Sequence, residues 1–275
     1  MSRYDVRDKT VAITGAGRGL GAALARVLHA RGANLALLGR APEPPAAVAD
    51  MIGSRAAWWE ADVTDSGSVA SSVAAAAEHF GGIDVVVANA GINNFTAVAG
   101  RDADAFERVI DVNLLGSWRT VHAAVPYVAE RRGYVLLISS LAACIHAPLQ
   151  GHYAASKAAI AALADSLRIE MKPAGARVGV AYLTFVRTDM MTRDTLGDPA
   201  GRLVWAGNKG PFGMVTPEET VAALVRGIER RSRKIVVPRR MLPVVLASGA
   251  FQPVIEPFFR PRRIAEAIRA SDSRR

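Results

Sequence analysis

Residues 10–21 read Thr-Val-Ala-Ile-Thr-Gly-Ala-Gly-Arg-Gly-Leu-Gly, and this stretch decides the fold of the chain. The β-branched run Thr10–Thr14 predicts a first strand, and residues 19–31 predict the helix that follows it. The glycines therefore lie between the end of a strand and the beginning of a helix. Glycine lets the backbone approach a pyrophosphate closely, and a helix N-terminus favours the negative charge of the phosphates. The stretch predicts a nucleotide-binding loop.

Strand and helix patterns alternate along the rest of the chain. Short apolar runs predict further strands at residues 34–38, 56–60, 84–88, 134–139, 177–183 and 234–237. Helical patterns lie between them at residues 66–80, 104–130, 152–171 and 217–231, and a short helix follows the prolines near residue 44. This rhythm is typical of βαβ units. We therefore expect an α/β fold, a doubly wound Rossmann-type parallel sheet of seven strands with helices on both faces.

Length and composition fit one catalytic domain. The 275 residues, 51% of them hydrophobic, are enough for a single large core. We expect the domain over residues 1–240 and a basic, partly apolar extension over residues 241–275. No secretory signal is expected in the polar N-terminus, and the single cysteine, Cys144, fits a reducing compartment, so a cytoplasmic location is expected. Cys and His residues do not fall at metal-ligand spacings, and no metal site is predicted.

Tyr153 and Lys157 lie four residues apart in the predicted helix 152–171, so their side chains share one face. A neighbouring ammonium stabilises a phenolate and lowers the pKa of the tyrosine toward the working pH. Such a tyrosine can give a proton to a substrate oxygen or take one from it. Ser140 precedes the pair, just after the strand predicted at residues 134–139. The arrangement predicts acid–base chemistry beside a bound nucleotide.

In this order the motifs resemble those of the short-chain dehydrogenase/reductase family, from Thr10 to about Val237. The glycine loop matches the family's TGxxxGxG, and Tyr153 to Lys157 matches its YxxxK. The resemblance implies a homo-oligomer, a tetramer or dimer, and a catalytic set of Asn113, Ser140, Tyr153 and Lys157. It also implies a set of cofactor contacts, to which we add Arg18 and Arg40 for the reason given below. The expected cofactor residues are Gly15, Arg18, Gly19, Leu20, Gly21, Arg40, Asp62, Val63, Asn89, Ala90, Gly91, Tyr153, Lys157, Val186 and Thr188.

The family resemblance also implies a role for each catalytic residue. Tyr153 exchanges a proton with the substrate oxygen, and Lys157 lowers the tyrosine pKa and holds the nicotinamide ribose. Ser140 hydrogen-bonds the reacting oxygen, and Asn113 positions a relay water. The sequence departs from the family after residue 182, where Leu183-Thr184 replaces the usual Pro-Gly, although Thr188 remains.

The residues just after the second predicted strand indicate which nicotinamide cofactor is bound. An acidic residue there would accept hydrogen bonds from the ribose 2′-OH of NAD(H). The sequence instead has Arg40, which can pair with a 2′-phosphate, and Arg18 in the glycine loop offers a second cation. These features predict NADP(H) rather than NAD(H). The alternative is an exposed Arg40 that stacks on the adenine.

The segment 189–216 is predicted to be a substrate lid. It contains many apolar residues, which either indicate an apolar substrate or simply pack on the core. They are Met190, Met191, Leu196, Leu203, Val204, Trp205, Phe212 and Met214. Cys144 and His146 lie between Ser140 and Tyr153, and ordinary loop residues are the preferred interpretation for both.

The C-terminal extension combines apolar and basic residues. Residues 220–275 hold 13 Lys and Arg against 4 Asp and Glu, which accounts for the whole net charge of +9. Such charge attracts anionic surfaces or only improves solubility. Prolines and a glutamate interrupt the apolar residues 241–259, which argues against a membrane-spanning helix. A wall of the substrate pocket or a subunit contact is the preferred interpretation, and peripheral membrane contact through residues 241–263 is second.

The predicted function is an NADP(H)-dependent oxidoreductase that interconverts a carbonyl and a secondary alcohol on an apolar, lipid-like or polycyclic substrate. No nucleic-acid partner is expected. The alternative from another class is a catalytically idle NADP-binding protein whose basic tail docks on a membrane or an acidic partner. The presence of Asn113, Ser140, Tyr153 and Lys157 together argues against that alternative.

Overall fold

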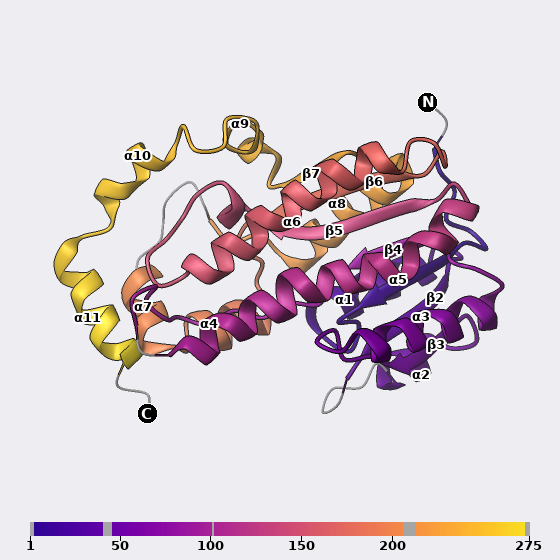
Figure 1. Cartoon of the computed structure of the whole chain (residues 1–275), viewed down its shortest axis with the longest axis horizontal. Helices are drawn as coiled ribbons and strands as arrows, with labels where there is room; N and C mark the ends of the chain where they lie inside the picture. Colours follow the sequence, from indigo (N-terminus) through magenta and orange to yellow (C-terminus); the bar gives the residue numbers. More distant parts are fainter. Residues whose placement is uncertain (1–2, 41–45, 101, 206–212, 273–275) are drawn as a thin grey trace.

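A computed structural model describes residues 3–40, 46–100, 102–205 and 213–272 of the chain (Figure 1). Within these residues, seven parallel strands form one sheet in the order β3-β2-β1-β4-β5-β6-β7. The predicted seven-stranded parallel sheet is confirmed. The strands are β1 (Thr10–Thr14), β2 (Asn34–Gly39), β3 (Ala56–Glu60), β4 (Val85–Ala88), β5 (Tyr134–Ser140), β6 (Arg177–Leu183) and β7 (Lys234–Val237).

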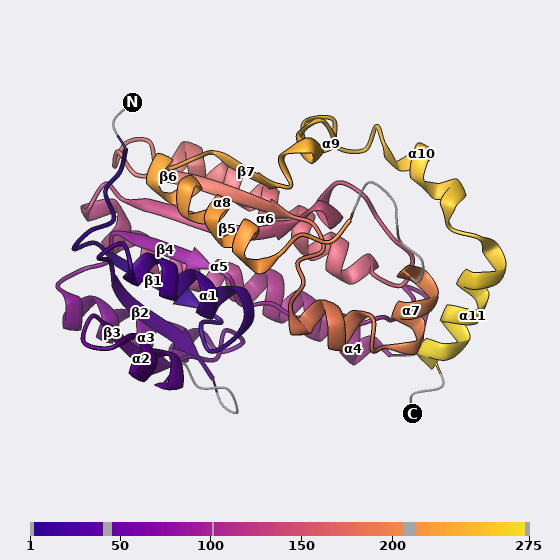
Figure 2. The same ribbon diagram turned by 180° about the vertical axis from the view of Figure 1, so that it is seen from behind.

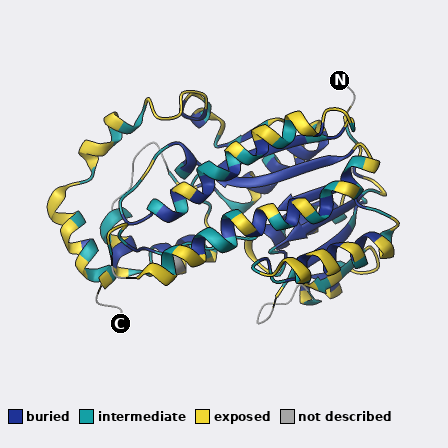
Figure 3. Cartoon of the chain, viewed as in Figure 1, coloured by how far each residue is buried: buried dark blue, intermediate teal, exposed yellow. Residues whose placement is uncertain are grey.

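Helices cover both faces of this sheet, as the doubly wound prediction requires. On one face lie α3 (Ser66–Phe80), α5 (Gly116–Glu130) and α6 (Gly151–Glu170), in front in Figure 1. On the other lie α1 (Gly19–His29), α2 (Ala46–Ile52) and α8 (Pro217–Arg230), in front in Figure 2. Each face has its own buried apolar cluster, and the inner strands β2, β1, β4, β5 and β6 are almost wholly buried, whereas the edge strand β3 is not (Figure 3). Strands buried on both faces explain the continuous apolar runs of the sequence.

The helix predicted over residues 104–130 is confirmed, with a π-helical turn inside it that the sequence did not predict. It comprises α4 (Ala103–Ile110), a π-helical turn Asp111–Leu115 and α5. The wider turn carries Asn113, whose side chain is fully buried and bonded to the backbone of the preceding loop. A π-turn inside a helix changes the direction of its side chains without ending it. Helical periodicity in the sequence does not reveal such a turn.

The predicted lid segment is partly helical. Met190–Thr195 forms a second π-helical turn, and α7 (Pro199–Trp205) follows it. Val215 returns to pair with Val186 after β6. Residues 206–212, which include the predicted lid residue Phe212, lie outside the described part of the chain. After the lid, α8 begins with a capping box between Thr216 and Glu219.

The C-terminal extension leaves the sheet and returns to the lid. It contains α9 (Leu242–Leu246), α10 (Gln252–Ile255), a 3-10 turn Glu256–Phe258 and α11 (Pro261–Asp272). Its first residues join the core beside α6, since Met241, Val244 and Val245 are buried there. The remaining part, residues 249–272, arches outward to α7, and we call it the strap (Figures 1 and 2). Ala267 of α11 and Ala200 of α7 are buried in one small apolar cluster.

Candidate active site

A cavity of about 1970 Å³ lies at the carboxyl ends of the strands. Segments that follow each of the seven strands line it, together with α6, the lid and the strap. Its volume exceeds the roughly 300–1,000 Å³ of an ordinary small-molecule pocket. In an open parallel sheet, ligands bind outside the carboxyl ends where the strand order reverses, here between β1 and β4. The cavity has room for a dinucleotide and a further molecule.

The glycine loop packs tightly against the loop that follows β4. Gly15 has a φ of +65°, and a Cβ there would come within 2.9 Å of the Ala90 Cα atom. A Cβ on Gly21 would lie 2.3 Å from the Gly15 carbonyl oxygen. Only glycine fits at both positions without moving the backbone. The loop is therefore fixed in shape before any ligand binds.

Thr14 and Asn89 hold the two loops together. The Asn89 Nδ2 atom donates to the Thr14 carbonyl at 2.9 Å and to the Gly15 carbonyl at 3.2 Å. The Asn89 backbone N–H donates to the Thr14 hydroxyl at 3.1 Å. Both residues belong to sequence motifs, but those motifs do not reveal that the two residues bond to one another. These contacts form because β1 and β4 are neighbours in the sheet.

Ser140, Tyr153 and Lys157 all line the cavity. The Lys157 Nζ atom lies 5.6 Å from the centre of the Tyr153 ring and donates to the Ile138 carbonyl at 3.0 Å. The Ser140 hydroxyl lies at the end of β5, where it donates to the Leu183 carbonyl at 3.2 Å and accepts from the Ala142 N–H at 3.1 Å. The shared helix face predicted for Tyr153 and Lys157 places both beside the serine.

Burial changes the protonation of this pair. The side chain of Lys157 is almost completely buried, and desolvation of its ammonium lowers its pKa to about 8. Desolvation of the phenolate raises the pKa of Tyr153, and a hydrogen bond with Ser140 offsets part of that rise. The net lowering of the tyrosine pKa that the spacing predicts is therefore wrong for the chain by itself. Removal of the phenol from water outweighs its stabilising neighbours.

Asn113 is the one predicted site residue that does not line the cavity. Its side chain is fully buried, its Oδ1 atom accepts from the Ile92 N–H at 2.8 Å, and its Nδ2 atom donates to the Ile92 carbonyl at 3.0 Å. Nδ2 also donates to the Ser156 hydroxyl at 3.3 Å. The amide thus ties the loop after β4 to helix α6. A Cβ on Gly91 would lie 3.2 Å from the Asn113 Oδ1 atom, so this loop packs closely on it.

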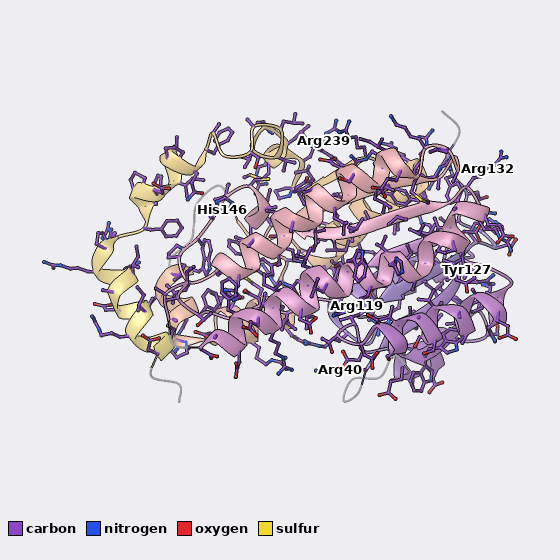
Figure 4. The ribbon with its side chains drawn as sticks, in the orientation of Figure 1. Arg40, Arg119, Tyr127, Arg132, His146 and Arg239 are labelled. Atoms are coloured by element: carbon purple, nitrogen blue, oxygen red, sulfur yellow. The ribbon has the colours of Figure 1, made fainter. Side chains whose placement is uncertain are left out.

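The predicted adenine side of the cavity contains an ion pair that sequence reasoning missed. The Arg40 Nη1 atom lies 3.1 Å from the Asp62 Oδ2 atom, and both residues line the cavity. Backbone and side-chain hydrogen bonds from Thr64 to the other carboxylate oxygen hold the pKa of Asp62 below its usual value. Arg40 lies at the end of β2 (Figure 4). Arg18 lies at the N-cap of α1 on the same cavity.

The departure from the family pattern after β6 leaves the backbone regular. Leu183 remains within β6, and the Thr184 N–H donates to the Val237 carbonyl at 3.0 Å. Val186 and Thr188 line the cavity, as predicted for cofactor contacts, and the Thr188 N–H donates to the Val186 carbonyl at 2.7 Å. The remaining predicted cofactor residues also line it: Gly19, Leu20, Val63, Asn89, Ala90 and Gly91.

Other polar side chains near the site are structural. Cys144 is buried, and neither it nor His146 lines the cavity. His146, labelled in Figure 4, exchanges two backbone hydrogen bonds with the side chain of Gln252 on the strap, at 2.9 and 3.2 Å. Within the described residues, no three His, Cys, Asp or Glu side chains group as metal ligands would. Nor does any helix of that part combine the length and apolarity needed to cross a bilayer.

Residues 9–198 match the sequence profile of a family described as short chain dehydrogenase. Dehydrogenase/reductase SDR family member 7B from Rattus norvegicus is 33% identical over 207 residues, 72% of this chain. The match spans 64% of the rat protein, slightly less than two thirds of its length. Trans-4-hydroxycyclohexanecarboxylate dehydrogenase from Sinomonas cyclohexanicum is 34% identical over 201 residues, which cover 69% of this chain and 78% of that enzyme.

A solved structure gives the same result for the fold. The alcohol dehydrogenase from Thermococcus sibiricus, solved with 5-hydroxy-NADP, superposes with a TM-score of 0.72 at 29% identity. The superposition covers 83% of this chain and 95% of that one. The sheet and its flanking helices therefore belong to one shared architecture.

Proposed function

Because this chain belongs to the short-chain dehydrogenase/reductase family, we propose that it is an NADP(H)-dependent oxidoreductase that interconverts a carbonyl and a secondary alcohol on an apolar substrate. The observation that carries the proposal is the convergence of Ser140, Tyr153 and Lys157 with the glycine loop in one cavity. Acid–base groups and a phosphate-binding loop at one site are what a hydride-transfer enzyme requires.

The residues present fit a nicotinamide dinucleotide. Within the described part of the chain, no side chain caps the N-terminus of α1 or places an acid in its first turn, so its N–H groups can donate hydrogen bonds to a phosphate. A Cβ on Gly19 would meet nothing within 4 Å, which leaves the phosphates open access to the loop. When bound, the cofactor supplies or accepts the hydride.

Tyr153 performs the proton transfer in this proposal. Its raised pKa keeps the phenol protonated near neutral pH, as a donor to the oxygen of a carbonyl under reduction must be. The Ser140 hydroxyl has one proton, which it donates to the Leu183 carbonyl in the chain alone; in the proposed complex it turns to the substrate oxygen and stabilises its negative charge. Lys157 places an ammonium beside the ring and holds the ribose. Asn113 acts as a positioning residue through the Ile92 backbone.

The proposed preference for NADP(H) rests on Arg40 and Arg18. Arg40 already pairs with Asp62, but a guanidinium has five donors and can bind a 2′-phosphate on its other edge. The Thermococcus enzyme, solved with an NADP derivative, supports the same choice. The apolar residues of the lid and strap that line the cavity support an apolar substrate.

The rest of the proposal concerns the whole protein. We keep the expectation of a homo-oligomer in the cytoplasm, which family membership and the single buried thiol of Cys144 support. Ser140, Tyr153 and Lys157 all line the cavity that contains the glycine loop, which argues against the catalytically idle alternative.

A single-turnover experiment tests the proposal. The full chain is mixed with NADPH, or in parallel with NADH, and then with a panel of cyclic and long-chain ketones, while the cofactor absorbance reports hydride transfer. We expect transfer from NADPH to at least the larger apolar ketones. Absence of transfer to every ketone from either cofactor, with cofactor binding intact, would overturn the enzymatic assignment.

A further inference from the structure

The cavity extends well beyond Tyr153, into a space enclosed by the lid and the strap. We call this part the distal chamber. Leu203, Val204 and Trp205 of α7 line it on one side, and apolar residues of the strap line it on the other. These are Phe251, Val254, Ile255, Phe258, Phe259 and Ile264. The chamber is continuous with the reaction site because the same cavity contains Tyr153.

The strap is anchored at several points, so the chamber is a built feature of the fold. Gln252 bonds both ways to the backbone of His146, and Ala267 packs against α7. Between these anchors, Trp205 links the two sides, with its ring 4.7 Å from that of Phe185 and 6.2 Å from that of Phe259. Figure 2 shows the strap ending beside α7.

Two strap residues of this lining carry large exposed apolar surface. Val254 is 63% exposed and Phe258 is 80% exposed, although both line the cavity. Apolar side chains that border a continuous cavity gain from a ligand that removes them from water. The chamber therefore fits an apolar molecule large enough to reach from the reaction site to the strap.

Two cationic side chains of the strap line the cavity. Arg260 immediately precedes α11, and Arg263 lies in its first turn. Neither guanidinium group forms a hydrogen bond or an ion pair with any part of the chain that the structure describes. Besides Asp62, the acidic side chains of the lining belong to α4, the π-turn after it and the loop after β6: Asp104, Glu107, Asp111 and Asp189. The one acid among residues 249–264, Glu256, does not line the cavity and bonds to Gln252. Two such guanidinium groups match a carboxylate or a phosphate.

We propose that the distal chamber binds the far end of an amphipathic substrate, an apolar carbonyl or alcohol compound with an anionic group that pairs with Arg260 and Arg263. The inference rests on the proposed function, since the opposite end of the same substrate meets Tyr153. It adds the chemical class of the substrate: an apolar body with a carboxylate or a phosphate at a fixed distance from the reacting carbon.

A binding experiment tests the chamber without any turnover. The full chain is titrated with dodecanoate, dodecyl phosphate and dodecanol, below the concentrations at which they form micelles, while tryptophan fluorescence is followed. Trp205→Phe identifies the signal that comes from the chamber. We expect the anions to bind about tenfold to a hundredfold more tightly than dodecanol, as a charge-assisted contact implies. Comparison of the two anions identifies which headgroup is preferred.

Variants of the two arginines decide whether they cause that preference. In the double variant Arg260→Gln with Arg263→Gln, dodecanoate should bind no more tightly than dodecanol, whose affinity reports that the chamber is intact. Arg262→Gln is the matched control, because Arg262 lies on the same helix but outside the cavity lining. Equal affinities of anion and alcohol for the wild type, or the same loss in the control, would overturn the proposal. So would binding that occurs only to micelles or anionic vesicles, which would instead indicate a lipid-docking surface.

A kinetic arm separates this inference from the proposed function. The ratio kcat/KM is measured for oxo fatty acids of increasing chain length and for their methyl esters. We expect an optimum length for the acids and a higher KM for them in the double variant. Turnover of small ketones without any preference for acids would leave the enzyme assignment standing and contradict the distal anion site. Loss of all turnover with preserved dodecanoate binding would contradict only the enzyme assignment.

Discussion

At Tyr153, burial and hydrogen bonding act on the phenol in opposite directions. Burial raises its pKa, and the hydrogen bond with Ser140 lowers it in part. The ammonium of Lys157 is itself destabilised by burial, which lowers its pKa to about 8. Near neutral pH the chain alone thus holds a protonated tyrosine beside a lysine close to its titration point. Such a site is prepared to donate a proton rather than to accept one.

Replacement of Tyr153 by phenylalanine tests the proton transfer. The variant should lose roughly 10²–10⁴ in kcat, because it lacks the only proposed proton donor. NADPH affinity should stay within a few-fold, since Lys157 and the glycine loop hold the cofactor. Tyr127→Phe is the matched control, because Tyr127 lies on α5 outside the cavity (Figure 4). Near-normal turnover by Tyr153→Phe, measured with any accepted ketone, would rule out the role.

Replacement of Arg40 by aspartate tests the cofactor preference. The change removes a cation from the cavity and places a second carboxylate beside Asp62, so NADPH should bind more weakly by a few kcal/mol, with about tenfold in affinity for each 1.4 kcal/mol. NADH, which lacks the 2′-phosphate, should be affected much less. Paired titrations of both cofactors check this, and Arg55→Asp, outside the cavity, controls for net charge. An unchanged preference would show that Arg40 does not contact the phosphate.

His152 makes the protein sensitive to acid. Its ring is fully buried, with Nε2 2.5 Å from the Asn94 Oδ1 atom, and burial lowers its pKa from 6.5 to about 4. The unfolded chain binds the proton more tightly, so stability is complete above pH 6.5 and is lost as the pH falls from there toward 4. The loss is on the order of 3 kcal/mol. Urea unfolding across this range should show a shallower pH slope for His152→Gln, and equal slopes would contradict the assignment.

At the scale of elements, the glycine loop depends on sterics rather than on sequence spacing alone. A Cβ at Gly21 would collide with the Gly15 carbonyl and come within 2.8 Å of the Asn89 Nδ2 atom. A Cβ at Gly19 would meet no atom within 4 Å, so a side chain there costs only the backbone strain of a φ of +54°. Substitution of the two glycines therefore distinguishes the effect of tight packing, at Gly21, from that of backbone strain, at Gly19.

Alanine at these two positions should have unequal effects. Gly19→Ala should cost roughly 1–2 kcal/mol of stability, the usual cost of a left-handed backbone. Gly21→Ala should cost more, because the loop and the Thr14–Asn89 contacts must move. Denaturant unfolding without cofactor measures both, and NADPH titration should show a larger affinity loss for Gly21→Ala. A smaller stability loss at Gly21 than at Gly19 would contradict the tight packing of the two loops.

At the scale of the whole molecule, the C-terminal extension has two different functions in the fold. Met241, Val244 and Val245 complete the core beside α6, whereas the strap mainly covers the cavity and packs on α7. The boundary between a catalytic domain and an extension at residue 240 remains a prediction. The burial of these three side chains favours a division nearer residue 248.

Two truncations test that division. Ending the chain after Pro238 removes three buried apolar side chains, each worth about 1.5–3 kcal/mol, and should destabilise the fold strongly. Ending it after Ser248 leaves that core complete, so most of the stability should remain. The kcat/KM for large apolar ketones should fall toward the value for small ketones. Thermal unfolding and the ketone panel provide the two measurements. Equal destabilisation by both truncations would mean that the strap is part of the core.

The sequence by itself determined the fold and most of the site. Strand and helix periods report local burial, and the glycine, Asn-Ala-Gly and Tyr-Lys motifs each lie at the end of a strand or the start of a helix. Because the carboxyl ends of parallel strands meet at one edge, these motifs had to converge. The resemblance of these motifs to the short-chain dehydrogenase/reductase family predicted Gly15, Asn89, Ser140 and Tyr153 as site residues, and all four line one cavity.

Only the tertiary structure decided the contacts between segments that no local pattern relates. The Arg40–Asp62 ion pair, the bonding of Asn113 to Ile92 rather than to the cavity, and the net rise in the pKa of Tyr153 all depend on which surfaces meet. The path of the strap is another example, since its apolar residues could have met a core, a bilayer or a second subunit. Periodicity reports that a side chain is buried, but the identity of what covers it depends on the path of the whole chain.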